Sequence, residues 1–243
     1  MPTNDRGEAV AKDKLRTVDL SDADRREELS RAFAILKYTH ESASALLEAL
    51  RVVRKQRHAT RGALTDEDQD LLRAMLVMAA SGLDSMVKQL IRDLLPILCK
   101  SDESVLDGFR EFVRRQLRGD AEGHLTTEVA KLFATWLTAE SVQSAVIEHY
   151  VGELTGDSLQ SSEQLLRATG ALGLPQKHVD KSVLAPIFAD RNRIIHELDI
   201  DFDAPRRNRR SRRIGKMIEA TNHILALAET LYEAGEAKLG PIP

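Results

Sequence analysis

The chain has 243 residues, a net charge of −3 and a hydrophobic fraction of 42%, which is enough apolar material to fill a core and argues against wholesale disorder. Aromatic residues make up only 4%, whereas alanine, leucine, glutamate and arginine abound, which favours helices over a β-sandwich or barrel. The single cysteine, Cys99, excludes a disulfide within the chain and a cysteine-rich zinc site.

The N-terminal residues and the apolar runs indicate where the protein resides. No apolar run reaches the roughly 20 residues that a membrane-spanning helix needs. Residues 1–22 are polar and charged, without apolar periodicity and without the hydrophobic segment of a secretion signal. We therefore expect a flexible charged tail over residues 1–22, a cytoplasmic location and no membrane partner.

The first two helices are predicted from their start signals. Ser21 followed by Asp24 resembles a capping box, and it opens a periodic stretch that ends near Arg57. Gly62 interrupts this pattern. Thr65 is followed by three acidic residues and predicts the start of a second helix, because the helix dipole favours negative charge in a first turn.

The rest of the chain shows further helical periodicity and no run of short alternating strands. Helices are expected over residues 105–117, from Thr126 or Thr127 through Trp136 and Ile147, and over residues 161–170, 183–198 and 209–237. Residues 198–203 alternate and predict a short extended connector. Its acids do not fit a calcium loop, because Ala204 stands where that loop requires glycine. The sequence thus predicts an all-α fold with a single helical domain over residues 23–238.

A short string, RNRIIH at residues 191–196, carries the chemical signal. An arginine, an asparagine directly after it and a histidine five positions on are expected by chance only on the order of 0.01 times in such a chain. Asn192 and His196 are four residues apart and therefore share one face of a helix. This spacing predicts a site on the helix over residues 183–198.

Arg191 falls on a different face, within an apolar stripe formed by Ile187, Ile194 and Leu198. A guanidinium in such a stripe is costly unless it finds a partner. In one interpretation Arg191 pairs with an internal acid such as Asp84, and His196 is an ordinary helix residue. In the other, Arg191 and His196 belong to a site. The basic segment that follows favours the site.

These residue types suit cleavage of RNA by its own 2′-hydroxyl. A histidine that titrates near neutral pH can take the hydroxyl proton. A guanidinium can hold two phosphate oxygens and stabilise the charge that develops on them. Asn192 can orient the imidazole or a phosphate oxygen, and use of the 2′-hydroxyl restricts the substrate to RNA.

A basic run lies between residues 206 and 216, with seven basic residues and no acid on an otherwise acidic chain. It could be a solvated helix start, but next to the motif we favour contact with RNA phosphates. The residues expected to bind RNA are Arg206, Arg207, Arg209, Arg210, Arg212 and Arg213. No metal or cofactor is expected, because no two histidines lie three or four apart and the glycines form no phosphate-binding fingerprint.

The string at residues 191–196 resembles the R-N-x-x-x-H signature of the HEPN ribonucleases, and in particular the RiboL-PSP-type HEPN domains. Residues 79–86 resemble the early core helix of these proteins, and residues 161–174 resemble the short helix before the motif. The resemblance extends over about residues 65–236. The members of the family that are silenced by adenylylation carry a tyrosine two residues after the histidine, where this chain has Leu198.

The resemblance implies a HEPN-like up-and-down helical bundle, here with an extra N-terminal helix, and a homodimer in which the two motif helices face each other. It also implies cleavage without a metal ion that leaves a 2′,3′-cyclic phosphate, with Arg191, Asn192 and His196 as catalytic residues. The expected function is a toxin or phage-defence endoribonuclease whose partners are RNA, a second copy of the chain and a cognate antitoxin or defence-system protein. The alternative is a non-catalytic HEPN-like module that binds RNA, a nucleotide or a partner protein.

Overall fold

The computed structural model describes residues 14–17, 26–59, 62–118 and 127–240. Within these ranges the chain forms eight α-helices, two short 3-10 helices and no strand, which confirms the predicted all-α class. The predicted cap at Ser21 and Asp24 lies outside the described residues, as does most of the predicted tail. The described part of that tail, residues 14–17, forms hydrogen bonds with two helices.

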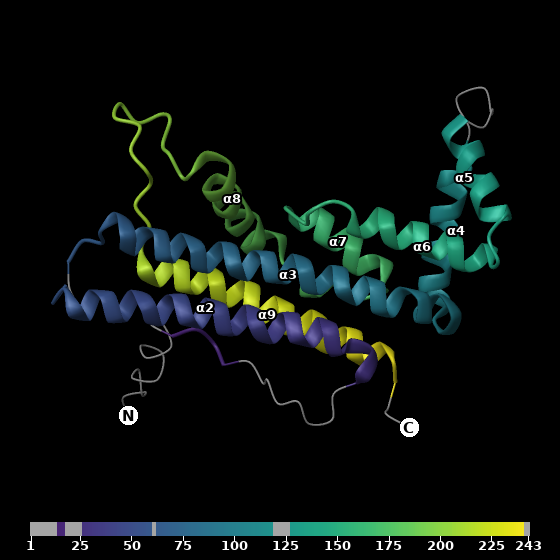
Figure 1. Ribbon diagram of the computed structural model, residues 1–243, viewed down its shortest axis with the longest axis horizontal. Coiled ribbons are helices and arrows are strands. Elements are labelled where there is room, and N and C mark those ends of the chain that lie inside the picture. Colours follow the sequence, from purple (N-terminus) through teal and green to yellow (C-terminus); the bar gives the residue numbers. More distant parts are fainter. Residues whose placement is uncertain (1–13, 18–25, 60–61, 119–126, 241–243) are drawn as a thin grey trace, which may run out of the picture.

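Helix α3 is the central element of the fold (Figure 1). It spans Asp66–Ser101 and begins with a full capping box, since the Thr65 hydroxyl accepts from the Asp68 amide and the Asp68 carboxylate accepts from the Thr65 amide. This confirms the predicted start at Thr65. By length and composition α3 could also cross a membrane, but half of its most apolar window is buried within the protein.

Two long helices pack along α3 and bury its apolar face (Figure 1). Helix α2 (Ser30–Gln56) follows the 3-10 helix η1 (Glu27–Leu29), and helix α9 (Ile214–Lys238) ends the described chain. The three helices share a core of fully buried aliphatic side chains, which includes Leu76, Leu90, Leu94, Leu225 and Leu231. Burial of each such side chain stabilises the fold by about 1.5–3 kcal/mol.

The remaining helices pack against α3 or against one another on the opposite side from α2 (Figure 1). They are α4 (Glu103–Gln116), α5 (Thr127–Leu137), α6 (Val142–Thr155), α7 (Ser162–Ala171), η2 (Gln176–His178) and α8 (Lys181–Glu197). Helix α5 contacts α6 and stands at the far end of α3. Helix α8 contacts α3, α7 and α9, so the motif helix is fixed from three sides.

Two predicted helices differ from the structure. The helix expected through Trp136 and Ile147 is two helices, because Ser141 caps a new helix by accepting from the Ser144 amide. The last helix begins at Ile214 and not at Arg209, because residue 209 forms an antiparallel bridge with Ile200. The arginines that suggested an early helix are held in this extended segment by acids of other elements.

Candidate functional site

Helix α8 carries the predicted motif and has defined ends. Asp180 caps its start, where the carboxylate accepts from the amides of Ser182 (2.8 Å) and Val183 (3.4 Å). The Ser182 hydroxyl also donates to this carboxylate at 2.7 Å, and this hydrogen bond, with those from the amides, holds the pKa of Asp180 below its usual range. The helix ends at Leu198, which has a φ of 50° in the left-handed region. Leu198 was expected on the buried stripe; it is instead 64% exposed, because the chain reverses there and turns its side chain away from the core.

Arg191 and Asn192 are joined by a hydrogen bond. The Arg191 Nη1 atom donates to Asn192 Oδ1 at 2.9 Å, and Asn192 Nδ2 donates to the Gln160 carbonyl at 3.4 Å, in the loop between α6 and α7. His196 is exposed and lies one turn beyond Asn192. The loop, the asparagine and the helix thus fix the guanidinium, while the imidazole faces solvent.

The structure does not place Arg191 beside Asp84, the acid considered as its partner. Asp84 forms an ion pair with Lys88 at 3.0 Å and accepts from the Leu159 amide at 3.0 Å. Among the residues that the structure describes, no carboxylate forms an ion pair with Arg191. The half-buried guanidinium is held by an amide and keeps its full charge for a further ligand.

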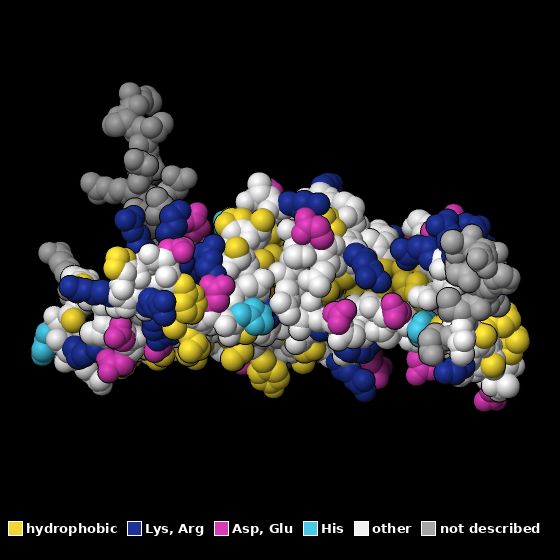
Figure 2. Space-filling model, turned by 90° about the horizontal axis from the view of Figure 1, so that it is seen from above, with side chains coloured by type: hydrophobic (Ala, Val, Ile, Leu, Met, Phe, Trp, Pro, Cys, Tyr) yellow, Lys and Arg dark blue, Asp and Glu magenta, His cyan; other side chains and the backbone are white. Residues whose placement is uncertain are grey.

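The basic run divides into two groups of arginines. Arg209, Arg210 and Arg212 form ion pairs with Asp70 (2.6 Å), Asp201 (3.1 Å) and Asp190 (2.8 Å), in that order. By contrast, Arg206, Arg207 and Arg213 are exposed and form no ion pair within the described part of the chain. Figure 2 shows a group of basic side chains, in dark blue, at the left end of the molecule. Three of the six predicted RNA contacts therefore also tie the segment to the fold.

Asp199 anchors this segment to the fold through buried hydrogen bonds, a role that the sequence did not indicate. Its carboxylate is fully buried and accepts from Arg73 Nε and Arg212 Nε, each at 2.9 Å. Burial raises the pKa of Asp199, but the hydrogen bonds from Arg212 and Arg73 outweigh it and hold the pKa below its usual value. Arg212 also pairs with Asp190 of α8, so this cluster links α3, α8 and the start of α9.

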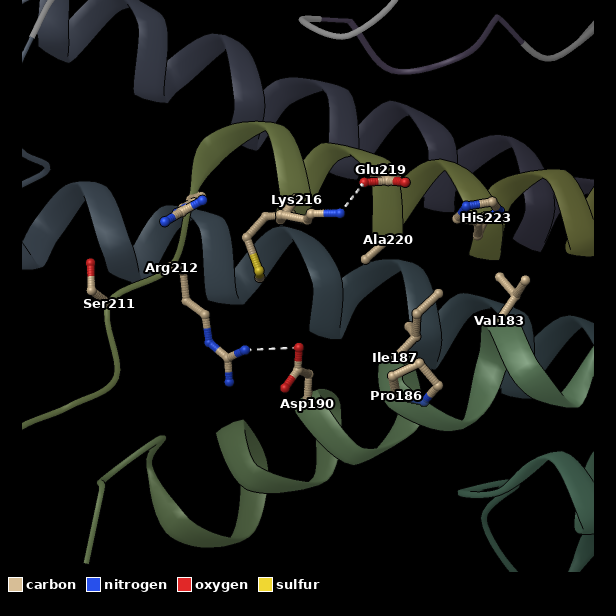
Figure 3. A pocket seen from close by; sticks show the side chains of 12 residues that line it. Val183, Pro186, Ile187, Asp190, Ser211, Arg212, Lys216, Glu219, Ala220 and His223 are labelled. Atoms are coloured by element: carbon tan, nitrogen blue, oxygen red, sulfur yellow. Dashed lines mark hydrogen bonds and ion pairs between the residues drawn. The ribbon is translucent and has the colours of Figure 1, made fainter. Parts of the chain in front are cut away.

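A groove of about 530 Å³ separates α8 from α9 (Figure 3). Apolar side chains line it from both helices, with Ile187 on α8 and Ala220 on α9. The Lys216–Glu219 ion pair lies along α9, and the Arg212–Asp190 pair links α8 to the segment before α9. Asn192 and His196 lie on another face of α8, because residues 190 and 192 are about 200° apart around a helix. The groove is therefore distinct from the predicted motif.

The described residues contain no group of three His, Cys, Asp or Glu side chains that could hold a metal ion. Comparison with family models, with curated proteins and with solved structures returned no match for this chain.

Proposed function

We propose that the chain is an endoribonuclease that cleaves RNA without a metal ion, through Arg191, Asn192 and His196 at the interface of a HEPN-like homodimer. The observation that carries this proposal is the state of Arg191. Its guanidinium is half-buried, held by the Asn192 amide oxygen at 2.9 Å, and without a carboxylate partner among the described residues. A guanidinium whose charge is not compensated attracts anions. It can donate two parallel hydrogen bonds to two oxygens of one phosphate.

His196 supplies the second requirement, a base that an RNA strand can reach. It is exposed, four residues beyond Asn192, and close to the C-terminal end of α8. In the proposed reaction His196 takes the proton of the 2′-hydroxyl, and the 2′-oxygen forms a bond to phosphorus as the bond from phosphorus to the 5′-oxygen breaks. The leaving 5′-oxygen takes a proton from the protonated His196 of the partner subunit. The products are a 2′,3′-cyclic phosphate and a 5′-hydroxyl.

The outer face of α8 supports a shared site. It carries two small, uncharged residues, Ala185 and Ala189, on the same side of the helix as Asn192 and His196. Exposed apolar side chains flank the end of the helix, among them Ile195 (38% exposed) and Leu198. An apolar face on a soluble protein favours association, and a two-fold axis would bring the same face of two chains together. Both motifs would then line one cleft.

Arg206, Arg207 and Arg213 are the residues that we propose to position the strand. They are exposed and unpaired within the described ranges, so their charges are available to phosphates. The alternative, a non-catalytic module that binds RNA, a nucleotide or a partner protein, is favoured by one observation: in a single chain His196 has no hydrogen-bond partner among the described residues. Both candidates use the same surface.

The test is cleavage of single-stranded RNA by the purified chain in excess EDTA. We expect RNA fragments that end in a cyclic phosphate, and no cleavage of DNA of the same sequence, which lacks the 2′-hydroxyl. Binding of RNA without cleavage would establish the alternative. Activity that appears only on addition of magnesium would overturn the metal-free mechanism.

A further inference from the structure

The described N-terminal residues, 14–17, lie across helices α2 and α9, where Figure 1 shows them as a purple segment beneath the two helices. This surface is separate from the motif on α8. The segment contacts one side chain of α2, His40, and two of α9, Asn222 and Glu229. It is not part of any helix, and the two helices hold it almost entirely through side chains.

Asn222 pairs with the backbone of this segment in both directions. The Arg16 amide donates to Asn222 Oδ1 at 2.7 Å, and Asn222 Nδ2 donates to the Lys14 carbonyl at 3.1 Å. His40 Nε2 donates to the Arg16 carbonyl at 2.8 Å. One amide therefore satisfies a donor and an acceptor two residues apart, as a neighbouring strand would. The side chains of two helices thus recognise the backbone of this segment.

Two side chains of the segment add sequence preference. The Arg16 guanidinium forms an ion pair with Glu229, whose side chain is only 15% exposed. Leu15 packs against the hydrophobic core. A charge-assisted pair to a carboxylate that is largely shielded from water contributes more than an exposed pair. The surface thus favours an apolar residue followed by arginine.

We propose that the surface formed by His40 of α2 and by Asn222 and Glu229 of α9 is a peptide-binding site for a Leu-Arg segment, and that residues 14–17 are its intramolecular occupant. A second copy of the same segment carries the same chemistry and competes for this surface. The attached segment has the advantage of an effective concentration in the millimolar range, so a separate peptide binds only when the attached one is released. This inference does not depend on the proposed ribonuclease activity.

The experiment uses the full chain and a fluorescent peptide with the sequence of residues 10–21, followed by fluorescence anisotropy. In the Arg16→Glu chain the attached segment carries the wrong charge for Glu229. We expect this chain to bind the peptide at least about tenfold more tightly than the unchanged chain does. Equal, weak binding to both chains would overturn the proposal.

Charge reversal provides the matched controls and keeps the test independent of one variant's folding. The Glu229→Arg chain should bind a peptide that carries the Arg16→Glu change, and should bind the original peptide less tightly. The doubly changed chain, Arg16→Glu with Glu229→Arg, should hold its own segment again and bind either peptide as weakly as the unchanged chain. Asn222→Ala, added to Arg16→Glu, should abolish the gain. Far-UV circular dichroism checks that each chain is folded. A doubly changed chain that still binds the peptide tightly would show that the ion pair does not hold the attached segment on this surface.

Discussion

Arg191 differs from the other shielded arginines of the chain in the group that holds it. Arg73 and Arg212 both donate to the buried carboxylate of Asp199, and each pairs with a second acid, Arg73 with Asp70 and Arg212 with Asp190. Arg191 donates to the amide oxygen of Asn192, which carries no charge. An arginine that is paired with a carboxylate has its charge compensated, whereas one held by an amide still attracts an anion. This difference underlies the first prediction.

Replacement of Arg191 or His196 by alanine should lower RNA cleavage by about 10²–10⁴-fold, because each change removes one group that acts on the reacting phosphate or hydroxyl. Arg193 is the matched control. It lies between them on the same helix and pairs with Asp190 at 2.7 Å, so Arg193→Ala should leave cleavage within about threefold and cost less than about 1 kcal/mol of stability. Initial rates and urea unfolding measure both effects. Unfolding of Arg191→Ala would assign that residue to the core.

Asp199 predicts a dependence of stability on pH. Its pKa is below the unfolded value, so the ionised carboxylate stabilises the fold above about pH 4, and this contribution is lost as the pH falls through the lower folded pKa. Asp199→Asn should therefore cost about 3 kcal/mol at pH 7, because two arginines lose their counter-charge. The difference from the unchanged chain should shrink below about pH 4. Urea unfolding over a pH series tests this, with exposed Asp203→Asn as the control; a constant difference would contradict it.

Among the helices, the boundaries set by neighbouring residues were predicted correctly, whereas those set by contacts distant in the sequence were not. Thr65 and the acids after it mark a helix start because the capping box needs only neighbouring residues. The break before Ser141 was missed, since serine within a helical pattern is a weaker interruption than glycine or proline. The start of α9 was missed because the arginines before Ile214 are held by acids of α3, α8 and the connector, which no local window contains.

The contact between α2 and α3 requires glycine at position 82. A Cβ atom there would lie 2.0 Å from Thr39 Oγ1 and 2.2 Å from Thr39 Cγ2. Gly82→Ala should destabilise the fold by about 2 kcal/mol, since overpacking outweighs the gain in helix propensity. Addition of Thr39→Ala removes these two atoms but leaves the Cβ atom of residue 39 at 2.6 Å, so it should recover only part of the loss in urea unfolding. Additive losses in the double variant would show that the two positions do not clash.

Substitutions in the two groups of arginines before α9 should have different effects, one on RNA binding and the other on the stability of the fold. Changing Arg206, Arg207 and Arg213 to glutamine should weaken RNA binding and reduce the salt dependence by about 2 in the slope of log K against log salt, with little loss of stability. Changing Arg209, Arg210 and Arg212 should instead lower the free energy of unfolding, because acids lose their partners. The binding is measured by anisotropy in the His196→Ala chain, where RNA stays intact. An unchanged slope in the first set would exclude these residues from the RNA contact.

At the scale of the whole molecule, the site is proposed to be complete only in a dimer. An Arg191→Ala chain mixed with a His196→Ala chain should recover part of the cleavage that each lacks alone, because some mixed dimers retain one intact arrangement. Native mass spectrometry confirms that mixed dimers form. Full activity in a monomer, or mixed dimers that remain inactive, would contradict a shared site.

The helix that carries the candidate site could be predicted from the sequence, and its surroundings could not. The spacing of Asn192 and His196 requires only helical periodicity, which the sequence displays. The tie from Asn192 to Gln160 and the position of Asp199 depend on contacts between elements far apart in the chain. Helical periodicity predicted that Leu198 lies on the apolar stripe of the helix. The prediction was wrong because Leu198 adopts the left-handed conformation just after the last helical residue, which turns its side chain away from that stripe.

The position of α9 has a consequence for synthesis on the ribosome. The fully buried Leu225 and Leu231 of α9 pack into the core that α2 and α3 begin. The 137 residues from position 101 to position 238 take roughly 7–27 s to add at about 5–20 residues per second. During that interval the nascent α2–α3 pair exposes the apolar face that α9 later covers. The chain should therefore depend on chaperones as it emerges, and α8 should not acquire its final packing before translation has reached α9.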